Sequence, residues 1–311
     1  MRHRLRDYLV YALGRGAIGV AAVLPQFCGY GLAALLGRLF FHCDRRRRRY
    51  ALRLLRNAFP GRPDAELARL GAVATGNIFK VPVDMARLTR LLARGGDLRR
   101  VIDVSQAQPL LPGNGPYLAL TAHLGSWEMA AAAMANIAHE AHGIARVFKN
   151  PLLQRWILAN RQRGGLHIHS RRGGIQGLTA ALGRGAVGLQ VVDQNQRLRG
   201  VFAPFFGERA SCERAAASLA LRRGYPIVVG MALRSGFGFR FRLVAVPPFV
   251  PVPTGDKEAD LQRTVGQIND RLEAFIRGTP EQYLWIHDRY RTQPLPRADQ
   301  PRTQAAADGD D

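Results

Sequence analysis

The sequence predicts an α/β fold in which a largely parallel central sheet is covered by helices, with an N-terminal membrane-anchoring helix in front of it. Two observations predict this arrangement. Downstream of residues 95–96, short β-rich runs alternate with helix-like stretches, which is typical of crossover connections between parallel strands. Upstream, an uncharged segment at 17–36 leads into five consecutive arginines at 45–49. The expected parts are an anchor over 1–42, a folded domain over 43–294 and a polar, disordered tail over 295–311.

The segment at 17–36 has about the length needed to cross a hydrocarbon core of roughly 30 Å as a helix. Pro25, Gln26 and several glycines interrupt it, so a kinked or interfacial anchor stays open beside a transmembrane one. The arginines at 45–49 would bind anionic headgroups, at roughly 1 kcal/mol for each cation near the surface. A solvated face or a nucleic-acid patch is the competing interpretation, but neither explains the apolar segment just before the arginines.

The folded domain begins with a helical pattern over 64–94 that we expect to break near Pro82. The run at 238–246 alternates residue by residue, which suits an edge or antiparallel strand. A last helix is expected at 257–278, followed by a closing helix that Thr279 would cap. The remaining strands are predicted at 116–122, 144–148, 166–170, 186–193 and 225–233, and the remaining helices at 126–140, 151–163, 174–184 and 213–223.

The charge of the chain is far out of balance. The 45 Lys and Arg residues exceed the 23 Asp and Glu residues, which gives a net charge of +22 and predicts anionic partners. Most of these cations are arginines, which suits bidentate binding of phosphate, although a GC-rich genome would produce the same bias. No RNP, helix-turn-helix or zinc-finger pattern is present, so we do not expect a nucleic-acid partner. The three cysteines form no CxxC pair and predict neither a disulfide framework nor a metal site.

His123 and Glu128 flank the junction between a predicted strand and a predicted helix. On a continuous helix, residues five apart lie roughly 140° around the axis and do not meet. A turn at Gly125, with Ser126 capping the next helix, would let the two side chains face each other. A carboxylate that binds one imidazole nitrogen leaves the other free as a general base. The backbone N–H groups at 125–128 would then hold a developing oxyanion.

Other chemistries fit this junction less well. No GxSxG motif supplies an enzyme nucleophile, so the base would act on a substrate hydroxyl. Zinc is not expected, because the HExxH spacing and a third ligand are missing. A structural histidine next to a capping glutamate remains the alternative, since an HxxxxE pattern alone is a weak indication.

Longer segments add specificity to this short pattern. The stretches "AHLGSWEMA" (122–130), "VVDQNQRLRGVFAPFFGERAS" (191–211) and "PEQYLWIHDRYRTQP" (280–294) resemble the bacterial lipid A biosynthesis acyltransferases, as do 148–165 and 219–234. The resemblance extends in order over roughly residues 5–294. It departs from the family after the Phe-Phe-Gly, where Ser211, Cys212 and Glu213 stand in place of threonine-rich text, and Cys212 suits packing better than nucleophilic chemistry.

The resemblance implies a membrane-bound O-acyltransferase at the cytoplasmic face of the bacterial inner membrane. The enzyme would move a fatty acyl chain from an acidic acyl carrier protein to a hydroxyl of an anionic, phosphorylated lipid A precursor. It would need no metal and no cofactor beyond the acyl carrier thioester. In the HX4D/E motif of the family, His123 matches the base and Glu128 its orienting carboxylate.

The resemblance also implies binding residues. Asp193 and Gln194 match the Asp-Gln pair of the family and follow a strand, which is where ligands bind in α/β sheets. Asp193 capping a turn, the arginines lying on an ordinary surface and the aromatic residues packing in the core are the competing interpretations. Arg146, Arg161, Arg163, Arg171 and Arg172 are candidates for binding phosphate or the phosphopantetheine of the carrier protein, and Trp127, Phe202, Phe205 and Phe206 for lining the acyl pocket.

Two further functions stay open from the sequence. The acceptor can be another glycolipid or a lysophospholipid, because nothing in the sequence identifies the head group. The chain can also be a non-catalytic relative that binds anionic membranes, although the intact His123 and Glu128 argue against it.

Overall fold

The computed structural model describes residues 2–294 except 114, 139, 146–148 and 171–172. In these residues a seven-stranded sheet has the order β1-β9-β8-β2-β5-β3-β4. Among its neighbouring strands only the pair β8–β9 is antiparallel and the other five pairs are parallel, so the sheet is mostly parallel, as predicted. The strands are β1 (Ile102–Asp103), β2 (Tyr117–Thr121), β3 (Ala141–Ala145), β4 (Leu166–Ser170), β5 (Val187–Val191), β8 (Ile227–Arg234) and β9 (Phe241–Ala245).

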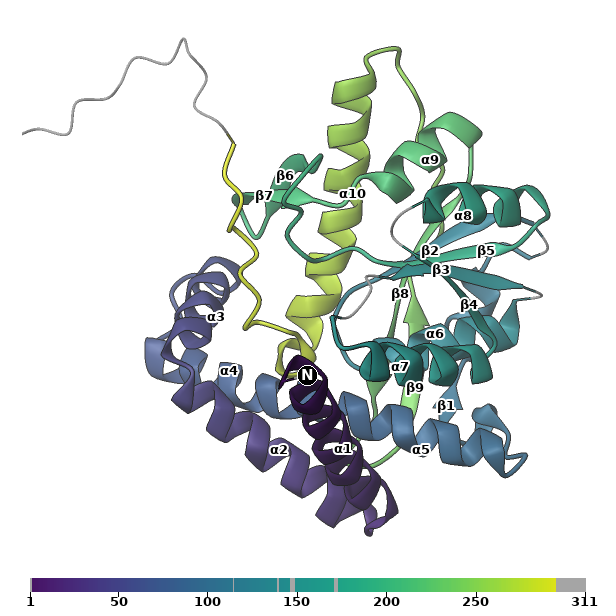
Figure 1. Cartoon of the computed structure of the whole chain (residues 1–311). Helices are drawn as coiled ribbons and strands as arrows, with labels where there is room; N and C mark the ends of the chain where they lie inside the picture. The colour runs from purple at the N-terminus through teal and green to yellow at the C-terminus, as the bar shows by residue number, and fades with distance from the viewer. Residues whose placement is uncertain (1, 114, 139, 146–148, 171–172, 295–311) are drawn as a thin grey trace, which may run out of the picture.

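Helices cover both faces of the sheet (Figure 1). α6 (Trp127–Ile137) packs on one face of the sheet. It contacts α5 (Val81–Ala93) and α7 (Pro151–Arg163), which lie on the same side. The other face carries α8 (Gly174–Gly183), α9 (Ala215–Arg223) and α10 (Lys257–Gly278).

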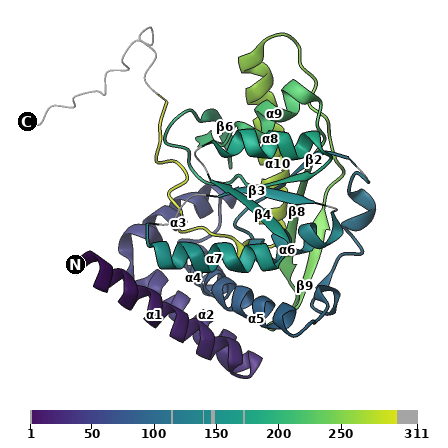
Figure 2. The same cartoon turned by 45° about the vertical axis from the view of Figure 1, so that its right-hand side comes forward.

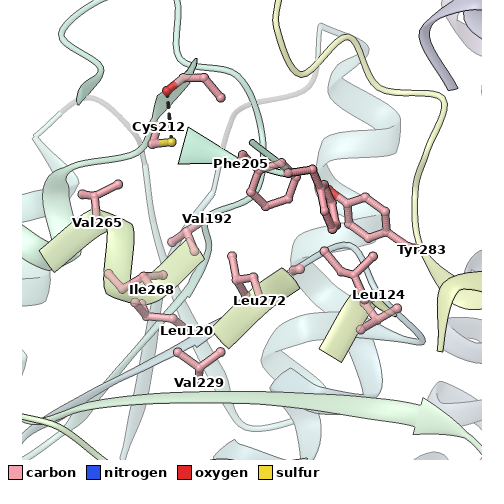
Figure 3. Packing of buried hydrophobic residues seen from close by; sticks show 14 of the residues in the cluster. Leu120, Leu124, Val192, Phe205, Cys212, Val229, Val265, Ile268, Leu272 and Tyr283 are labelled. Atoms are coloured by element: carbon pink, nitrogen blue, oxygen red, sulfur yellow. Dashed lines mark hydrogen bonds between the residues drawn. The ribbon is translucent and has the colours of Figure 1, made fainter. Parts of the chain in front are cut away.

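Each face buries its own apolar core. Figure 3 shows part of the core under α10, where Leu120 and Val229 of the sheet face Ile268 and Leu272 of the helix. Because neighbouring residues of a strand point to opposite faces, Leu120 and Ala119 belong to different cores. The sheet is therefore buried on both sides, which explains why its strands read as nearly continuous apolar runs.

The N-terminal segment forms a helical hairpin, α1 (Arg2–Val23) and α2 (Gln26–Cys43), which continues into α3 (Arg45–Ala58) and α4 (Asp64–Phe79). Figure 2 shows the hairpin at the periphery of the molecule. Its glycines permit close contacts between helices. A Cβ on Gly29 would lie 2.1 Å from the carbonyl oxygen of Ala21, and one on Gly37 2.6 Å from that of Thr75.

The expected anchor takes a different form in the structure. The uncharged segment at 17–36 is divided between α1 and α2 at Pro25, because proline removes a backbone donor and its ring disfavours a continuous helix. In the described part of the chain, no helix combines enough length and enough hydropathy to span a bilayer. The predicted tail at 295–311 lies outside the described residues.

Two other segments differ from expectation. An antiparallel hairpin that was not predicted consists of β6 (Val201–Phe205) and β7 (Glu208–Cys212), joined by a tight turn at Phe206 and Gly207 with positive φ angles. The closing helix is only a 3₁₀ turn, η3 (Pro280–Gln282), and the Thr279 side chain does not cap it. Short 3₁₀ turns, η1 (Leu98–Arg100) and η2 (Gln108–Leu110), flank β1.

Candidate active site

The candidate site lies where β2 and β5 end side by side. After β2 the chain turns at Gly125, whose φ of +64° favours glycine, and enters α6. A Cβ on Gly125 would lie 2.2 Å from the carbonyl oxygen of Ala232, so the turn fits closely against β8. The predicted bend between His123 and Glu128 is therefore present.

The imidazole of His123 is held by Asp193, which follows β5. Its Nδ1 lies 2.7 Å from Asp193 Oδ1, and its backbone N–H donates to Oδ2 at 3.0 Å. Asp193 is only 2% exposed. Both carboxylate oxygens therefore bind the same residue, and they fix the imidazole ring and its backbone together.

The charge state of Asp193 sets the tautomer of His123. Burial alone would raise the pKa of Asp193, but the charge and hydrogen bonds of His123 outweigh it and lower this pKa to about 2. The ionised carboxylate only accepts hydrogen bonds, so Nδ1 of His123 carries the proton and donates it. Nε2 is left as the basic nitrogen on the opposite side of the ring.

Glu128 does not orient His123 in this arrangement, contrary to the sequence-based expectation. Its carboxylate accepts hydrogen bonds from Arg161, at 2.7 Å from Nη2 and 3.1 Å from Nε, and from Trp127 Nε1 at 3.1 Å. The first turn of α6 directs Glu128 toward α7, which carries Arg161. Asp193 thus holds the position next to His123 that was assigned to Glu128, and it does not line the cavity described below.

The backbone donors at the turn are also used differently from expectation. Gly125 N–H donates to Gln282 at 3.0 Å, and Ser126 N–H donates to Ala232 at 2.9 Å. Neither group is therefore available for an oxyanion. Ser126 occupies the N-cap position of α6, but its side chain makes no cap hydrogen bond.

Two more polar side chains lie next to the imidazole. The predicted residue Gln194 places its amide nitrogen 3.3 Å from His123 Nε2. His287, which the sequence analysis did not select, accepts a hydrogen bond from the backbone N–H of Asn195 at 3.0 Å. Burial lowers the pKa of His287 to about 4, so this residue is neutral at neutral pH. His287 lies in "WIHDRY", part of the stretch 280–294 that resembles the family, and this resemblance was the available sign in the sequence that it belongs to the site.

A buried ion pair supports the turn from behind. Arg234, the last residue of β8, donates to the fully buried Asp84 of α5, which also accepts from Tyr30 of α2 at 2.7 Å. The backbone N–H of Arg234 donates to Gln282 Oε1 at 2.8 Å, and Gln282 in turn binds Gly125. The N-terminal hairpin and the turn at Gly125 are therefore linked through one hydrogen-bonded network.

The site opens into a cavity of about 1960 Å³ lined by His123, Trp127 and Gln194. The ring of Trp127 meets that of His123 edge-on, with centroids 4.7 Å apart. Among the described lining residues, nine are Lys or Arg and four are Asp or Glu, which leaves the lining cationic. The nine are Arg46, Arg47, Lys149, Arg161, Arg197, Arg199, Arg214, Arg222 and Arg291.

The predicted phosphate-binding arginines only partly match this lining. Arg161 lines the cavity but is paired with Glu128, and Arg163 is exposed on α7 outside the lining. Arg146, Arg171 and Arg172 lie outside the described residues. Sequence reasoning missed the arginines that α3, α9 and the loop after β5 bring to the cavity, because only the fold places these distant segments together.

The three phenylalanines predicted to line the acyl pocket do not line the cavity at His123. Phe205 and Phe206 are buried in the core under α10, where Phe206 packs against Trp285 with ring centroids 5.8 Å apart. Phe202 lies on the same hairpin and does not line the cavity. The β6–β7 hairpin carries these rings away from the strand ends, and an apolar run in the sequence does not reveal that direction.

Fold and site together define an α/β enzyme that carries a carboxylate-held histidine at its strand ends. A family model described as bacterial lipid A biosynthesis acyltransferase matches residues 2–292. The chain therefore belongs to this family, and it is an acyltransferase.

Individual relatives are distant but nearly full-length. The chain is 27% identical over 303 residues to the lipid A biosynthesis lauroyltransferase of Escherichia coli (strain K12), which covers 92% of this chain and 93% of that protein. It is 25% identical over 280 residues to the lipid A biosynthesis myristoyltransferase of the same organism, covering 88% and 84%. A solved 1-acyl-sn-glycerophosphate acyltransferase, PlsC, from Thermotoga maritima aligns at 12% identity and a TM-score of 0.37, covering 89% of this chain and 99% of that one.

Proposed function

We propose that the protein transfers a fatty acyl chain from an acyl carrier protein thioester to a hydroxyl of a phosphorylated lipid A precursor. The observation that carries this is His123, whose Nδ1 is held by an ionised Asp193 while the ring lines a cavity with cationic walls. Such an imidazole can act as a general base toward a hydroxyl in that cavity.

In the proposed reaction, His123 Nε2 removes the proton of the acceptor hydroxyl as its oxygen attacks the thioester carbonyl carbon. The tetrahedral intermediate collapses, the C–S bond breaks, and the imidazolium returns its proton to the leaving thiolate. Asp193 stays ionised throughout and stabilises the imidazolium. His123 is therefore the catalytic base, and Asp193 is the residue that positions it.

The oxyanion needs donors other than Gly125 and Ser126. The first turn of α6 begins at Trp127, and its N–H groups have no acceptor within the helix. These groups, together with the amide of Gln194, are the donors we assign to the oxyanion.

The cations of the cavity suit the proposed substrates. Guanidinium groups bind phosphate oxygens in a bidentate manner, and a cationic mouth attracts an acidic carrier protein. Arg46 and Arg47 of α3 come from the run of five arginines, and they line the same cavity as His123. This placement brings the basic run of the sequence to the site.

A membrane attachment is proposed for the outer face of the α1–α2 hairpin. Apolar side chains of both helices are exposed to solvent, and the arginine-rich helix α3 follows α2 directly in the chain. An amphipathic surface of this kind binds the interface of an anionic bilayer without crossing it, which we place at the cytoplasmic face of the inner membrane. The exposed apolar residues are Leu5, Tyr8, Leu9, Val10, Leu13, Val20, Val23, Phe27, Leu32, Leu35, Leu36 and Leu39.

The test is transfer of a labelled acyl chain from carrier protein to a phosphorylated lipid A precursor by the purified protein. His123→Ala should lower kcat by roughly 10³-fold or more, because the base is lost. The matched control is His167→Ala, since His167 is exposed on β4 and does not line the cavity. Equal turnover by the two variants would show that His123 is not the base. Transfer to other glycolipids or to lysophospholipids, but not to the lipid A precursor, would show that the acceptor is one of those lipids instead.

A further inference from the structure

The cavity at His123 extends onto both faces of the sheet. Ala119 pairs with Leu189, and Leu120 pairs with Gln190, in adjacent positions of β2 and β5. Successive residues of a strand point to opposite faces, yet all four of these residues line the cavity. The cavity therefore wraps around the strand ends, and His123 stands at the junction.

One branch lies between the sheet and α6, and we name it the α6 arm. The residues that define it are all apolar, and several of them are small. In the proposed function this arm suits the hydrocarbon of the donor. The defining residues are Ala119, Ala130, Met134, Gly143, Ile168 and Leu189.

The other branch, the α9 arm, lies between the sheet and helices α8 and α9, and it is defined by Leu120, Ile144, Ile175, Gln190, Ser218 and Arg222. Gln190 is 8% exposed, and in the described part of the chain its Oε1 has no hydrogen-bond partner. Farther out, Arg222 Nη1 donates to Ser218 Oγ at 2.8 Å. Arg214 also lines the cavity, just before the first residue of α9.

An unpaired buried amide oxygen indicates what this arm binds. Leaving such an acceptor without a donor costs free energy, so native structures pair nearly all of them. A hydrocarbon chain has no donor to offer. The occupant that fits Gln190 carries an N–H group, and the one that fits Arg214 and Arg222 carries an anionic group.

We propose that the α9 arm binds the 4′-phosphopantetheine arm of the thioester donor. This linear group carries two amide N–H groups and ends in a phosphate. The side-chain amide of Gln190 pairs with an amide of this group, and Arg214 and Arg222 bind the phosphate. The donor then bends around the strand ends, with its thioester at His123 and its acyl chain in the α6 arm. This inference rests on the proposed function and specifies how the donor binds at that site.

The test compares three soluble donors with the same acyl chain: an alkyl thioester without amides, acyl-pantetheine and acyl-phosphopantetheine. Gln190→Leu should raise KM for acyl-pantetheine by about tenfold, and leave KM for the alkyl thioester and for the acceptor within about twofold. The matched control is Gln176→Leu, because Gln176 is exposed on α8 and does not line the cavity. Gln190→Met, with a different apolar shape, replaces Gln190→Leu if the latter does not fold.

The phosphate end has its own comparison. Arg222→Gln should raise KM for acyl-phosphopantetheine by about tenfold and leave KM for acyl-pantetheine unchanged, because only the first donor carries the phosphate. Arg223→Gln is the control, since Arg223 is the next residue on α9 and does not line the cavity.

Two results would overturn the inference. One is an equal effect of Gln190→Leu on thioesters with and without amides, and the other is an effect on KM of the acceptor alone. If the wild-type protein uses none of the three donors, the same variants are measured with acyl carrier protein, where Gln190→Leu should again raise donor KM about tenfold. Absence of transfer by the wild-type protein in that assay would contradict the proposed function instead.

Discussion

At the scale of single residues, the main result is that Asp193 and Glu128 have separate roles. Asp193 binds His123 through both carboxylate oxygens, whereas Glu128 binds Arg161 and Trp127. The two acids therefore support different parts of the site: Asp193 holds the imidazole of His123, and Glu128 holds the contact between α6 and α7.

Asp193→Asn should lower kcat by roughly 10³- to 10⁴-fold while the protein remains folded, because an amide no longer fixes the tautomer of His123. Acyl transfer kinetics and circular dichroism check this. A turnover within tenfold of the wild type would contradict the role of Asp193.

Glu128→Gln and Arg161→Met should have non-additive effects on kcat/KM, because each removes the same ion pair. The single variants and the double variant form the cycle that measures this coupling. The opposite result would be strong coupling of Glu128→Gln to His123→Ala and none to Arg161→Met. It would indicate that Glu128 orients His123, as its spacing in the sequence suggested.

Asp193 also makes stability depend on pH. Its pKa is about 2 when folded against a usual 3.8, so its contribution is fully present above about pH 4 and is lost as pH falls through about 2. The difference corresponds to about 2 kcal/mol. Urea unfolding at several pH values should show a smaller loss of stability between pH 4 and pH 2 in Asp193→Asn than in the wild type. An equal loss of stability in the two proteins over this pH range would contradict the contribution of Asp193.

The site residues were partly predictable from the sequence. The spacing of His123, Gly125 and Glu128 indicated a strand, a turn and a helix, and the structure contains all three. The partner of His123 was not predictable from that spacing, because Asp193 is 70 positions away and becomes adjacent only through the pairing of β2 with β5. Local patterns indicate which residues carry chemistry, and the register of the sheet determines which of them meet.

At the scale of elements, the hairpin of α1 and α2 depends on glycine contacts. Gly29→Ala should lower the free energy of unfolding by about 1–3 kcal/mol, because the new Cβ meets the carbonyl oxygen of Ala21. Gly31→Ala, on the same helix with nothing within 4 Å, should be neutral or stabilise by up to about 1 kcal/mol. Thermal unfolding of both variants checks the contrast, which would fail if the two behaved alike.

Most elements were predictable because their periodicity is strong. The expected helices at 151–163 and 257–278 and the expected strand at 166–170 agree with α7, α10 and β4. The β6–β7 hairpin was missed because its turn uses Phe206 rather than a usual turn residue. Glu273 of α10 accepts from the backbone N–H of Phe206 at 2.6 Å and supports that positive φ, and this contact is tertiary.

At the scale of the whole molecule, the proposed membrane attachment rests on the exposed apolar residues of the α1–α2 hairpin. Leu13→Glu together with Phe27→Glu should lower binding to anionic vesicles by about tenfold or more, because both side chains are at least 70% exposed on that hairpin. Val252→Glu, exposed elsewhere, is the control. Vesicle sedimentation checks this, and unchanged binding of the double variant would place the attachment on another surface.

The two arms of the cavity have a consequence for the order of events in turnover. In the proposed binding mode the donor occupies the two arms, which leaves the part of the cavity lined by Arg46 and Arg47 of α3 for the acceptor, so both substrates bind before the first product departs. Initial velocities measured against donor at several fixed acceptor concentrations should therefore give double-reciprocal lines that intersect, as for a ternary complex. Parallel lines would instead require a covalent acyl-enzyme and a nucleophile in the chain.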